Sequence, residues 1–489
     1  MKKEYNGYIT LYLALTIGVL ISLVFTMMEG VRMQTIRLET EGVMDIGLHS
    51  VFGEYNRQLL EQYDLFYIDT TYGEGKPSVE KLQEHLQYYM NRNFVKKEIE
   101  SWLGYRDLTA LYCDNIVLEG YERPSDCEGQ ILKKQIVEYM KDKEGIALLE
   151  TAAEYANLIQ ANGFDSRDVE GEWSQVQGEI QHLLEQKKQE LLQSGEEETE
   201  VEVGIDNPAD YVAGVKGRGI LSLALSSGVT LSGVEIHPEY YLSHRTVLNG
   251  LGSTYQHNSV IQGTAEKLLV QNYLFEKCGS FQKPLDKGVL KYQIEYLLKG
   301  KSKDEENLRQ VVEDILHIRE AANIAYLLSD NEKQSEADLL ATVITAVLFM
   351  PQLQQAVKLS ILFAWAYAES IKDIRILLDG NKVPMIKNSD SWNTPLIQLL
   401  TFVSHLGDYK KSESGMSYED YLNTFLFMKS EKEVLYRFMD ICEMDIRITE
   451  GNSYFQMDGC ISTATARANV SSSYGYGYEI IRSFSYLQQ

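Results

Sequence analysis

The feature that most constrains this chain is an uncharged apolar run from Tyr8 to Met28, close to the N-terminus. At ~1.5 Å of rise per residue, about 21 helical residues span roughly 30 Å, the thickness of the hydrocarbon core of a bilayer. A helix of this length and composition fits a membrane span. Residues 1–30 are therefore predicted to form an N-terminal membrane anchor, with membrane lipid as the partner of Tyr8–Met28.

Two alternatives to an anchor stay open, a cleaved secretory signal and a buried core helix. A signal peptide has a shorter apolar region, which is followed by small residues at the cleavage site. Here the run ends instead in Thr26-Met27-Met28-Glu29, which favours an anchor that is kept.

Basic residues on either side of the run set the expected orientation. Lys2 and Lys3 precede the run, and positive charges that flank a span are kept on the cytoplasmic side. Arg32 and Arg37 follow the run and weaken the contrast. We expect a single-pass protein of the cell membrane with a cytoplasmic N-terminus and an extracytoplasmic body.

Composition excludes some functions for that body. The chain has 489 residues, of which 44% are hydrophobic, enough for two or three domains with substantial cores. A net charge of −25 repels nucleic acid, which we exclude as a partner. The five cysteines contain no C-x-x-C pair, so neither a zinc site nor a dense disulfide framework is expected. Pairing of Cys113 with Cys127, or of Cys442 with Cys460, is an alternative to free buried thiols.

Apolar residues continue at three-to-four-residue spacing beyond the run, which predicts one helix from about Tyr8 to Tyr63. Glycines in its outer half each cost up to about 1 kcal/mol relative to alanine, so this half needs packing partners. Residues 31–193 are expected to form this stem and a first α+β region. An acidic linker is predicted at 194–208, and a helical or mixed C-terminal body at 209–489.

The remaining pattern predicts an α+β fold that is predominantly helical. Strands are expected at 64–69 and 108–119, and the Ser/Tyr/Gly-rich C-terminus has the alternation of a terminal strand pair. Helical periodicity predicts further helices at 78–97, from about 130, and at 165–193, 307–328, 418–428 and 431–444.

A second apolar stretch, Leu339–Val357, is also long enough to cross a membrane. Pro351, Gln354 and Gln355 interrupt it, and unpaired polar side chains cost several kcal/mol in lipid. We interpret the stretch as two core helices joined near Pro351, with a second span as the alternative.

No motif has the spacing that catalysis, cofactor binding or metal binding requires, so we predict no enzyme, no cofactor and no site residues of these kinds. His237-Pro238-Glu239 and His244 lack the i, i+4 histidine pair of metalloproteases. Gly300-Lys301-Ser302 resembles the end of a phosphate-binding loop, but Glu295 stands where the first glycine belongs. The glycines of 214–219 lack the dinucleotide-binding spacing and predict a loop.

Gly7 lies just before the apolar run, as the cleavage-site glycine does in prepilin-like proteins. In those proteins a Glu at the fifth mature position directs assembly, and here the corresponding residue is Tyr12. Cleavage and polymerisation are therefore not predicted, although the anchor and stem have a pilin-like architecture.

Short segments along the chain carry one further resemblance: Gly7-Tyr8-Ile9-Thr10, Glu29-Gly30-Val31-Arg32, 50–56, 59–66, Asn207-Pro208-Ala209-Asp210, 318–323 and 364–370. They are similar to an uncharacterised domain family of clostridial, Gram-positive bacteria, whose members are encoded beside genes for Tad-type (type IV-like) pili. The resemblance covers most of the chain. It implies an outward-facing component or accessory of a Tad-like pilus or secretion apparatus, whose partners are other pilus-assembly or pilin-like proteins.

We therefore expect a structural or accessory protein at the cell surface, comparable to a minor pilin. A membrane-tethered ligand-binding or sensory module is the first alternative. An extracytoplasmic enzyme of unknown reaction is the second.

Overall fold

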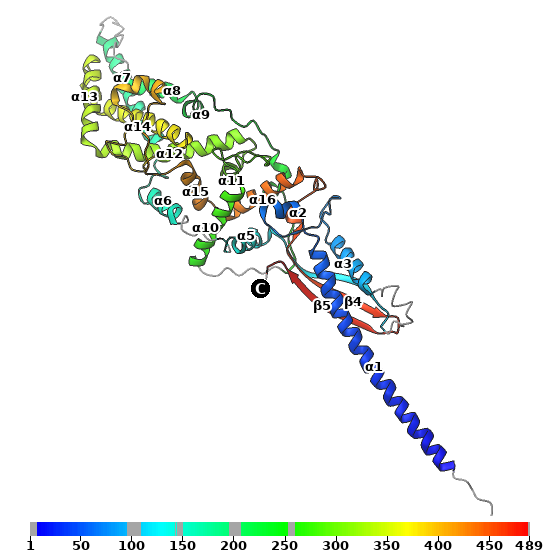
Figure 1. Ribbon diagram of the computed structural model, residues 1–489. Coiled ribbons are helices and arrows are strands. Elements are labelled where there is room, and N and C mark those ends of the chain that lie inside the picture. Colours follow the sequence, from blue (N-terminus) through cyan, green and yellow to red (C-terminus); the bar gives the residue numbers. More distant parts are fainter. Residues whose placement is uncertain are drawn as a thin grey trace, which may run out of the picture. The chain divides into compact units, whose positions relative to one another are not determined.

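The computed structural model describes residues 7–94, 109–141, 143, 150–194, 207–252 and 260–487. It is 63% helical with 10% strand, which confirms the predominantly helical α+β class. The chain folds as two compact units (Figure 1). Unit 1 comprises Met1–Tyr139, Leu242–His257 and Cys442–Gln489, and unit 2 comprises Met140–Tyr241 and Asn258–Ile441.

The two units are defined by packing and therefore combine segments that are distant in the sequence. The segments predicted as 1–30, 31–193, 194–208 and 209–489, in contrast, each run continuously along the chain. Both ends of the chain belong to unit 1, because strands near the C-terminus pair with a strand from the first third of the chain. Most of the predicted acidic linker, residues 195–206, lies outside the described residues.

Helix α1 (Gly7–Phe52) begins unit 1, and a turn separates it from α2 (Arg57–Tyr63). The prediction of one helix as far as Tyr63 is therefore wrong. The physical reason is a new helix cap, since the side chain of Asn56 accepts a hydrogen bond from the backbone N–H of Leu59 at 3.0 Å.

The sheet of unit 1 joins segments that are far apart in the sequence. Its strands β2 (Leu111–Glu122), β4 (Thr463–Ser472) and β5 (Gly477–Ser485) are antiparallel, in the order β2-β4-β5. In the central strand, Arg467 pairs with Val117 on one side and Ile481 on the other. The predicted terminal strand pair is thus present as β4 and β5. A smaller sheet pairs β1 (Ile68–Asp69) with β3 (Cys460–Ile461).

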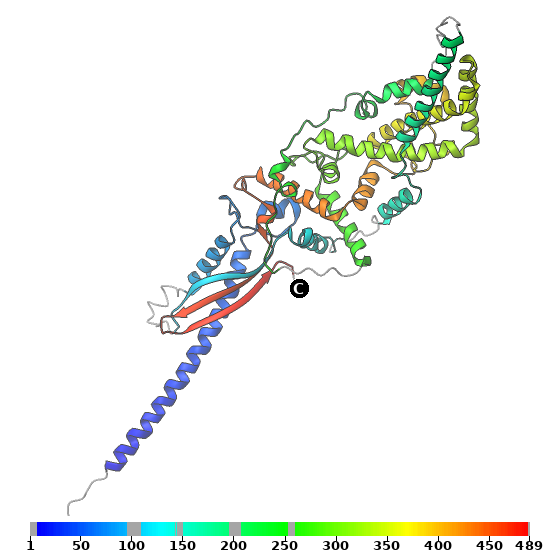
Figure 2. The same cartoon turned by 180° about the vertical axis from the view of Figure 1, so that it is seen from behind.

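Helices α1 and α3 (Val79–Phe94) pack beside this sheet, as Figures 1 and 2 show. Along β4, buried and partly exposed residues alternate, as expected of a strand with one covered face. Ala464, Ala466 and Ala468 are among the buried residues, and these small side chains let the helices approach the sheet closely. The other elements of unit 1 are η3 (Leu242–His244), η6 (Met457–Gly459) and parts of α5 (Asp126–Lys141) and α16 (Glu431–Arg447).

Unit 2 is a helical body centred on α14 (Gln354–Leu378), most of whose residues are buried. The helices that pack against α14 are α7 (Val169–Ser194), α8 (Pro208–Lys216), α9 (Ile220–Ala224), α12 (Asp304–Ser329) and α13 (Asn331–Val347), together with η4 (Pro351–Leu353) and η5 (Leu396–His405). The remaining elements are α6 (Glu150–Ala161), η2 (Pro238–Tyr240), α10 (Val260–Lys277), α11 (Gln293–Lys299) and α15 (Tyr418–Met428).

The second apolar stretch belongs to this helical body. Helix α13 ends at Val347, η4 begins at Pro351, and α14 continues from Gln354. Among the described residues, α1 alone is long and apolar enough to cross a membrane. The predicted division of this stretch into two helices near Pro351 is confirmed.

Candidate functional site

The apolar half of α1, residues 8–28, extends away from the rest of unit 1 (Figure 1), and none of its most apolar 18-residue window is buried. Thr10, Thr16 and Thr26 each donate the hydroxyl hydrogen to a backbone carbonyl three or four residues earlier, at 2.8–2.9 Å. In lipid, a hydroxyl without such a partner costs several kcal/mol. The hydroxyls of these three threonines are thus compatible with hydrocarbon.

The second half of α1 is a packing surface. Its buried residues include Ile36, Val43, Met44, Leu48, Val51 and Phe52. A Cβ atom on Gly47 would lie 3.0 Å from Leu86 Cδ1 and 3.1 Å from Met90 Cγ, so glycine permits the close approach of α3. One unbroken helix therefore has two different environments, an exposed apolar half and a half built into the core of unit 1.

The turn between β4 and β5 lies against α1 where these two halves meet. Tyr476 donates a hydrogen bond from its hydroxyl to the Glu29 carboxylate. Arg32 Nη1 lies 3.4 Å from a carboxylate oxygen of Glu29, and the guanidinium carbon lies 4.5 Å from the centre of the Tyr474 ring. These contacts hold the tip of the sheet beside the first helical turn after Met28.

Strand β5 continues along α1 from this junction. The Tyr478 hydroxyl lies 3.5 Å from Glu41, and Arg482 Nε lies 3.5 Å from Asp45. At the far end of the strand, the hydroxyl of Tyr486 donates to the last backbone carbonyl of α1. Polar contacts thus join the helix and the strand over the whole packed half of α1.

Between the two ends of this contact, helix α1 and the chain of strand β5 span the same length. From Tyr476 to Tyr486, a strand rises about 34 Å at ~3.4 Å per residue. From Glu29 to Phe52, a helix rises about 34 Å at ~1.5 Å per residue. The sheet therefore fixes the packed half of α1 along its full length and leaves the apolar half projecting.

A buried network of charges in unit 2 is the second notable constellation. Arg319 of α12 donates to Asp373 of α14 through Nε at 3.0 Å and Nη2 at 2.8 Å. Lys387 Nζ donates to Asp373 Oδ1 at 2.6 Å and also to Glu369. Burial opposes ionisation of Asp373, but Lys387 and Arg319 outweigh it and lower the pKa of this carboxyl. The network links α12, α14 and the loop that follows α14.

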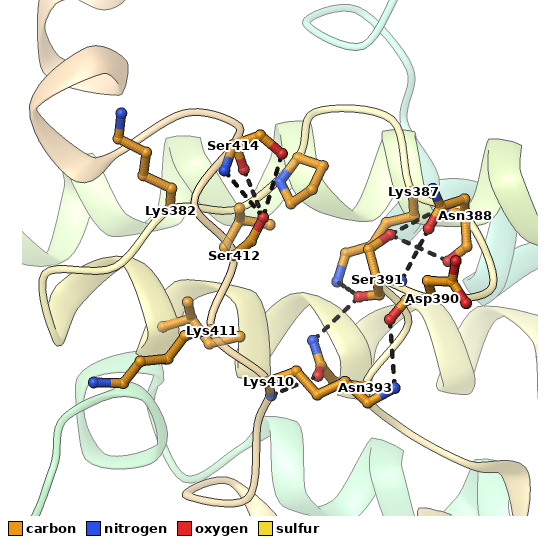
Figure 3. Close-up of a pocket in the computed structure, with 13 residues that line it drawn as sticks. Lys382, Lys387, Asn388, Asp390, Ser391, Asn393, Lys410, Lys411, Ser412 and Ser414 are labelled. Carbon is orange, nitrogen blue, oxygen red and sulfur yellow. Dashed lines mark hydrogen bonds between the residues drawn. The ribbon is translucent and has the colours of Figure 1, made fainter.

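A pocket of about 290 Å³ lies over Lys387 (Figure 3). Its polar groups bind one another: the backbone N–H of Asn388 donates to Ser391 Oγ at 2.9 Å, and the backbone N–H of Ser391 donates to Asn388 Oδ1 at the same distance. On the opposite wall, Lys382 and Lys411 extend away from these side chains (Figure 3). The pocket holds no nucleophile paired with a base, so its geometry gives no support to catalysis.

The histidine and glycine motifs considered in the sequence do not line this pocket. His237 is exposed and lies 3.5 Å from Glu239, and His244 ends the short helix η3. Gly300 ends α11 in a left-handed conformation with φ of 65°, so it is a helix cap. Within the described ranges, no group of three His, Cys, Asp or Glu residues is arranged to hold a metal ion.

Neither suggested disulfide forms, because one cysteine of each suggested pair, Cys113 and Cys460, is a free buried thiol. Burial raises the pKa of Cys113 to about 12 and that of Cys460 well above its usual range. These two thiols are therefore protonated and unreactive at neutral pH.

These features define an α+β protein with one long apolar N-terminal helix, which fits a single-pass membrane anchor or a signal sequence. Within that class, residues 196–472 match the model of a family described as "Family of unknown function (DUF5702)". The chain belongs to this family, which confirms the expectation of an uncharacterised domain family. No curated protein and no solved structure matches the chain. Helix α1 and strand β2 precede the matched residues.

Proposed function

We propose that this protein is a single-span, membrane-anchored structural or accessory component of a Tad-like pilus or secretion apparatus, comparable to a minor pilin. Its N-terminus is cytoplasmic and its body extracytoplasmic. Its partners are other pilus-assembly or pilin-like proteins, and its role does not involve catalysis.

The observation that carries the proposal is the division of α1 into two halves. Residues 8–28 are exposed and apolar, and residues 36–52 contribute to a core with an antiparallel sheet. A helix of this kind serves as a stem that holds a folded body at a fixed distance from the bilayer. The resemblance of the chain to proteins encoded beside Tad pilus genes supplies the choice of apparatus.

Orientation is tested with a tag placed after Gln489 and protease added to intact cells stripped of their wall. We expect loss of the tag while a cytoplasmic reporter stays intact. Protection of the tag in intact cells, followed by cleavage once the membrane is dissolved, would contradict an extracytoplasmic body.

The pilus role is tested by deleting the gene and measuring surface pili and total pilin. We expect pili to be lost while pilin is still made, with recovery when the wild-type gene is returned. Unchanged piliation in the deletion strain would reject this role.

A further inference from the structure

We propose that the hairpin tip, residues 473–476 between β4 and β5, is a second membrane contact in which Tyr474 and Tyr476 lie among lipid headgroups. This inference rests on the proposed single-span anchor and adds a second point of attachment to it. Its ligand is the headgroup layer on the side of the bilayer that faces the body.

The position of the hairpin tip along α1 gives the first argument. The hydrocarbon core of a bilayer is about 30 Å thick and the whole bilayer about 40–45 Å, which leaves roughly 5–7 Å of headgroups on each side. Glu29 and Arg32 lie about 1.5 and 6 Å beyond Met28 along the helix axis, at ~1.5 Å per residue. Because these residues hold Tyr476 and Tyr474, the tip falls within the headgroup layer.

The chemistry of the hairpin tip gives the second argument. The side chain of Tyr474 is 48% exposed, although its ring stacks on Arg32. A tyrosine ring has an apolar body and a polar end, and tyrosines are enriched at the level of the headgroups in membrane proteins. The guanidinium of Arg32, which is paired with Glu29, lies at the same depth, at the level of the lipid phosphates.

Two contacts at one depth constrain the molecule more than a helix alone does. A single span rotates about its own axis and tilts within the bilayer. A hairpin tip held in the headgroup layer beside that span opposes both motions. The body of unit 1 is then held in one orientation relative to the bilayer.

The test uses spin labels on the full chain, reconstituted in phosphatidylcholine–phosphatidylglycerol vesicles, with depth read from accessibility to oxygen and to a water-soluble nickel chelate. A Cys127→Ser background removes the exposed cysteine, and the other four cysteines are buried. Labels at Phe25, Ser473 and Ile481 sample the predicted hydrocarbon, the tip and the middle of β5. Ile481 is the matched control, since it is exposed on the same hairpin about 17 Å beyond Tyr476 at ~3.4 Å per residue.

We expect hydrocarbon depth at Phe25, headgroup depth at Ser473 and full water accessibility at Ile481. Replacing Tyr474 by Ser should make the label at Ser473 more accessible to the nickel chelate, by several-fold. If Ser473 is as accessible to water as Ile481 while Phe25 lies in hydrocarbon, the hairpin-tip contact is rejected and the anchor stands. If Phe25 itself is accessible to water, the proposed anchor fails.

Discussion

Tyr476 donates a hydrogen bond to Glu29, a residue 447 positions earlier in the sequence. The bond joins the last hairpin of the chain to the first helix, at the point where that helix leaves its apolar segment. Segments near the two ends of the sequence thus belong to one structural unit, and the two segments of unit 2 lie between them in the sequence.

Charges placed in the apolar half of α1 should prevent the proposed anchoring without disturbing the fold. Leu15 and Val19 are 62% and 68% exposed, so a Leu15→Arg/Val19→Arg variant loses no packing in the body. Each arginine near the middle of a span costs about 2.5–3.5 kcal/mol on insertion. We expect this variant to be extracted from membranes by alkali, as measured by fractionation.

A matched control adds the same charge to the same helix outside the membrane. Leu38 and Ile46 are 65% and 51% exposed in the packed half of α1, and Leu38→Arg/Ile46→Arg should stay in the membrane fraction. Equal extraction of both variants would show that the apolar run is not the anchor.

Gly47 and Gly42 should respond in opposite directions to the same substitution. A Gly47→Leu side chain meets Leu86 and Met90 of α3, and overpacking of this kind typically costs about 1–3 kcal/mol. No atom lies within 4 Å of a Cβ at Gly42, so Gly42→Leu should stabilise α1 by up to about 1 kcal/mol. Hydrogen exchange of residues 36–52, followed by mass spectrometry, measures both effects. Slower exchange in Gly47→Leu than in the wild type would be evidence against the packing of α1 on α3.

Removal of Asp373 should destabilise unit 2 strongly. The Asp373→Ala variant leaves Arg319 and Lys387 buried without their shared acceptor, which typically costs about 3–5 kcal/mol. Glu313→Ala is the control on the same helix as Arg319, because it removes an exposed pair with Arg309 that is worth about 0.3–0.5 kcal/mol. Tryptophan fluorescence during denaturant unfolding reports on this unit, which contains Trp173, Trp365 and Trp392. Similar losses in both variants would contradict a stabilising role for the buried network.

Stability should also depend on pH through Glu295. Burial raises the pKa of this carboxyl from 4.5 to about 7, while Phe281 N–H and the Tyr418 hydroxyl hydrogen-bond to it at 2.9 and 2.8 Å. The folded state then binds more protons than the unfolded state between about pH 4.5 and 7, so this contribution to stability is lost as pH rises through that window. We expect the free energy of unfolding of Glu295→Gln, relative to the wild type, to rise by about 2–3 kcal/mol from pH 5 to 8.

Urea unfolding at several pH values measures this difference, and the substitution Glu305→Gln, at an exposed residue, is the control. A flat difference for Glu295→Gln as well would mean that Glu295 is already ionised in the folded state at pH 5.

Local elements of this fold were predictable from the sequence, and long-range pairing was not. The helices at 418–428 and 431–444 follow regular apolar spacing, and the structure has them as Tyr418–Met428 and Glu431–Arg447. The strand at 108–119 is β2, but its partner β4 lies more than 300 residues later, and periodicity carries no information about which strands pair. The helix predicted to Tyr63 failed at the Asn56 cap, where a local hydrogen bond competes with apolar spacing.

The features of the candidate functional site could be predicted from the sequence only in part. The apolar run predicted the exposed apolar half of α1 directly, because composition and length are local properties. The junction of Glu29 with Tyr476 was not predictable, since it depends on the pairing of distant segments. The buried network had one sequence signal, the charges of Glu369, Lys372 and Asp373 after the apolar part of α14, because charges on a buried helix require partners.

The arrangement of the sheet delays completion of unit 1 until nearly the whole chain has been synthesised. Helix α1 leaves the ribosome first, but β5, which covers it, is completed only at Ser485. At ~5–20 residues per second, the roughly 430 residues in between take about 20–90 s to synthesise. Until then the face of α1 that packs on β5 lacks this partner, although α3, which also packs on α1, is synthesised soon after it. The core of unit 1 is therefore completed only when the last hairpin has been made, later than Ile441, the last residue of unit 2.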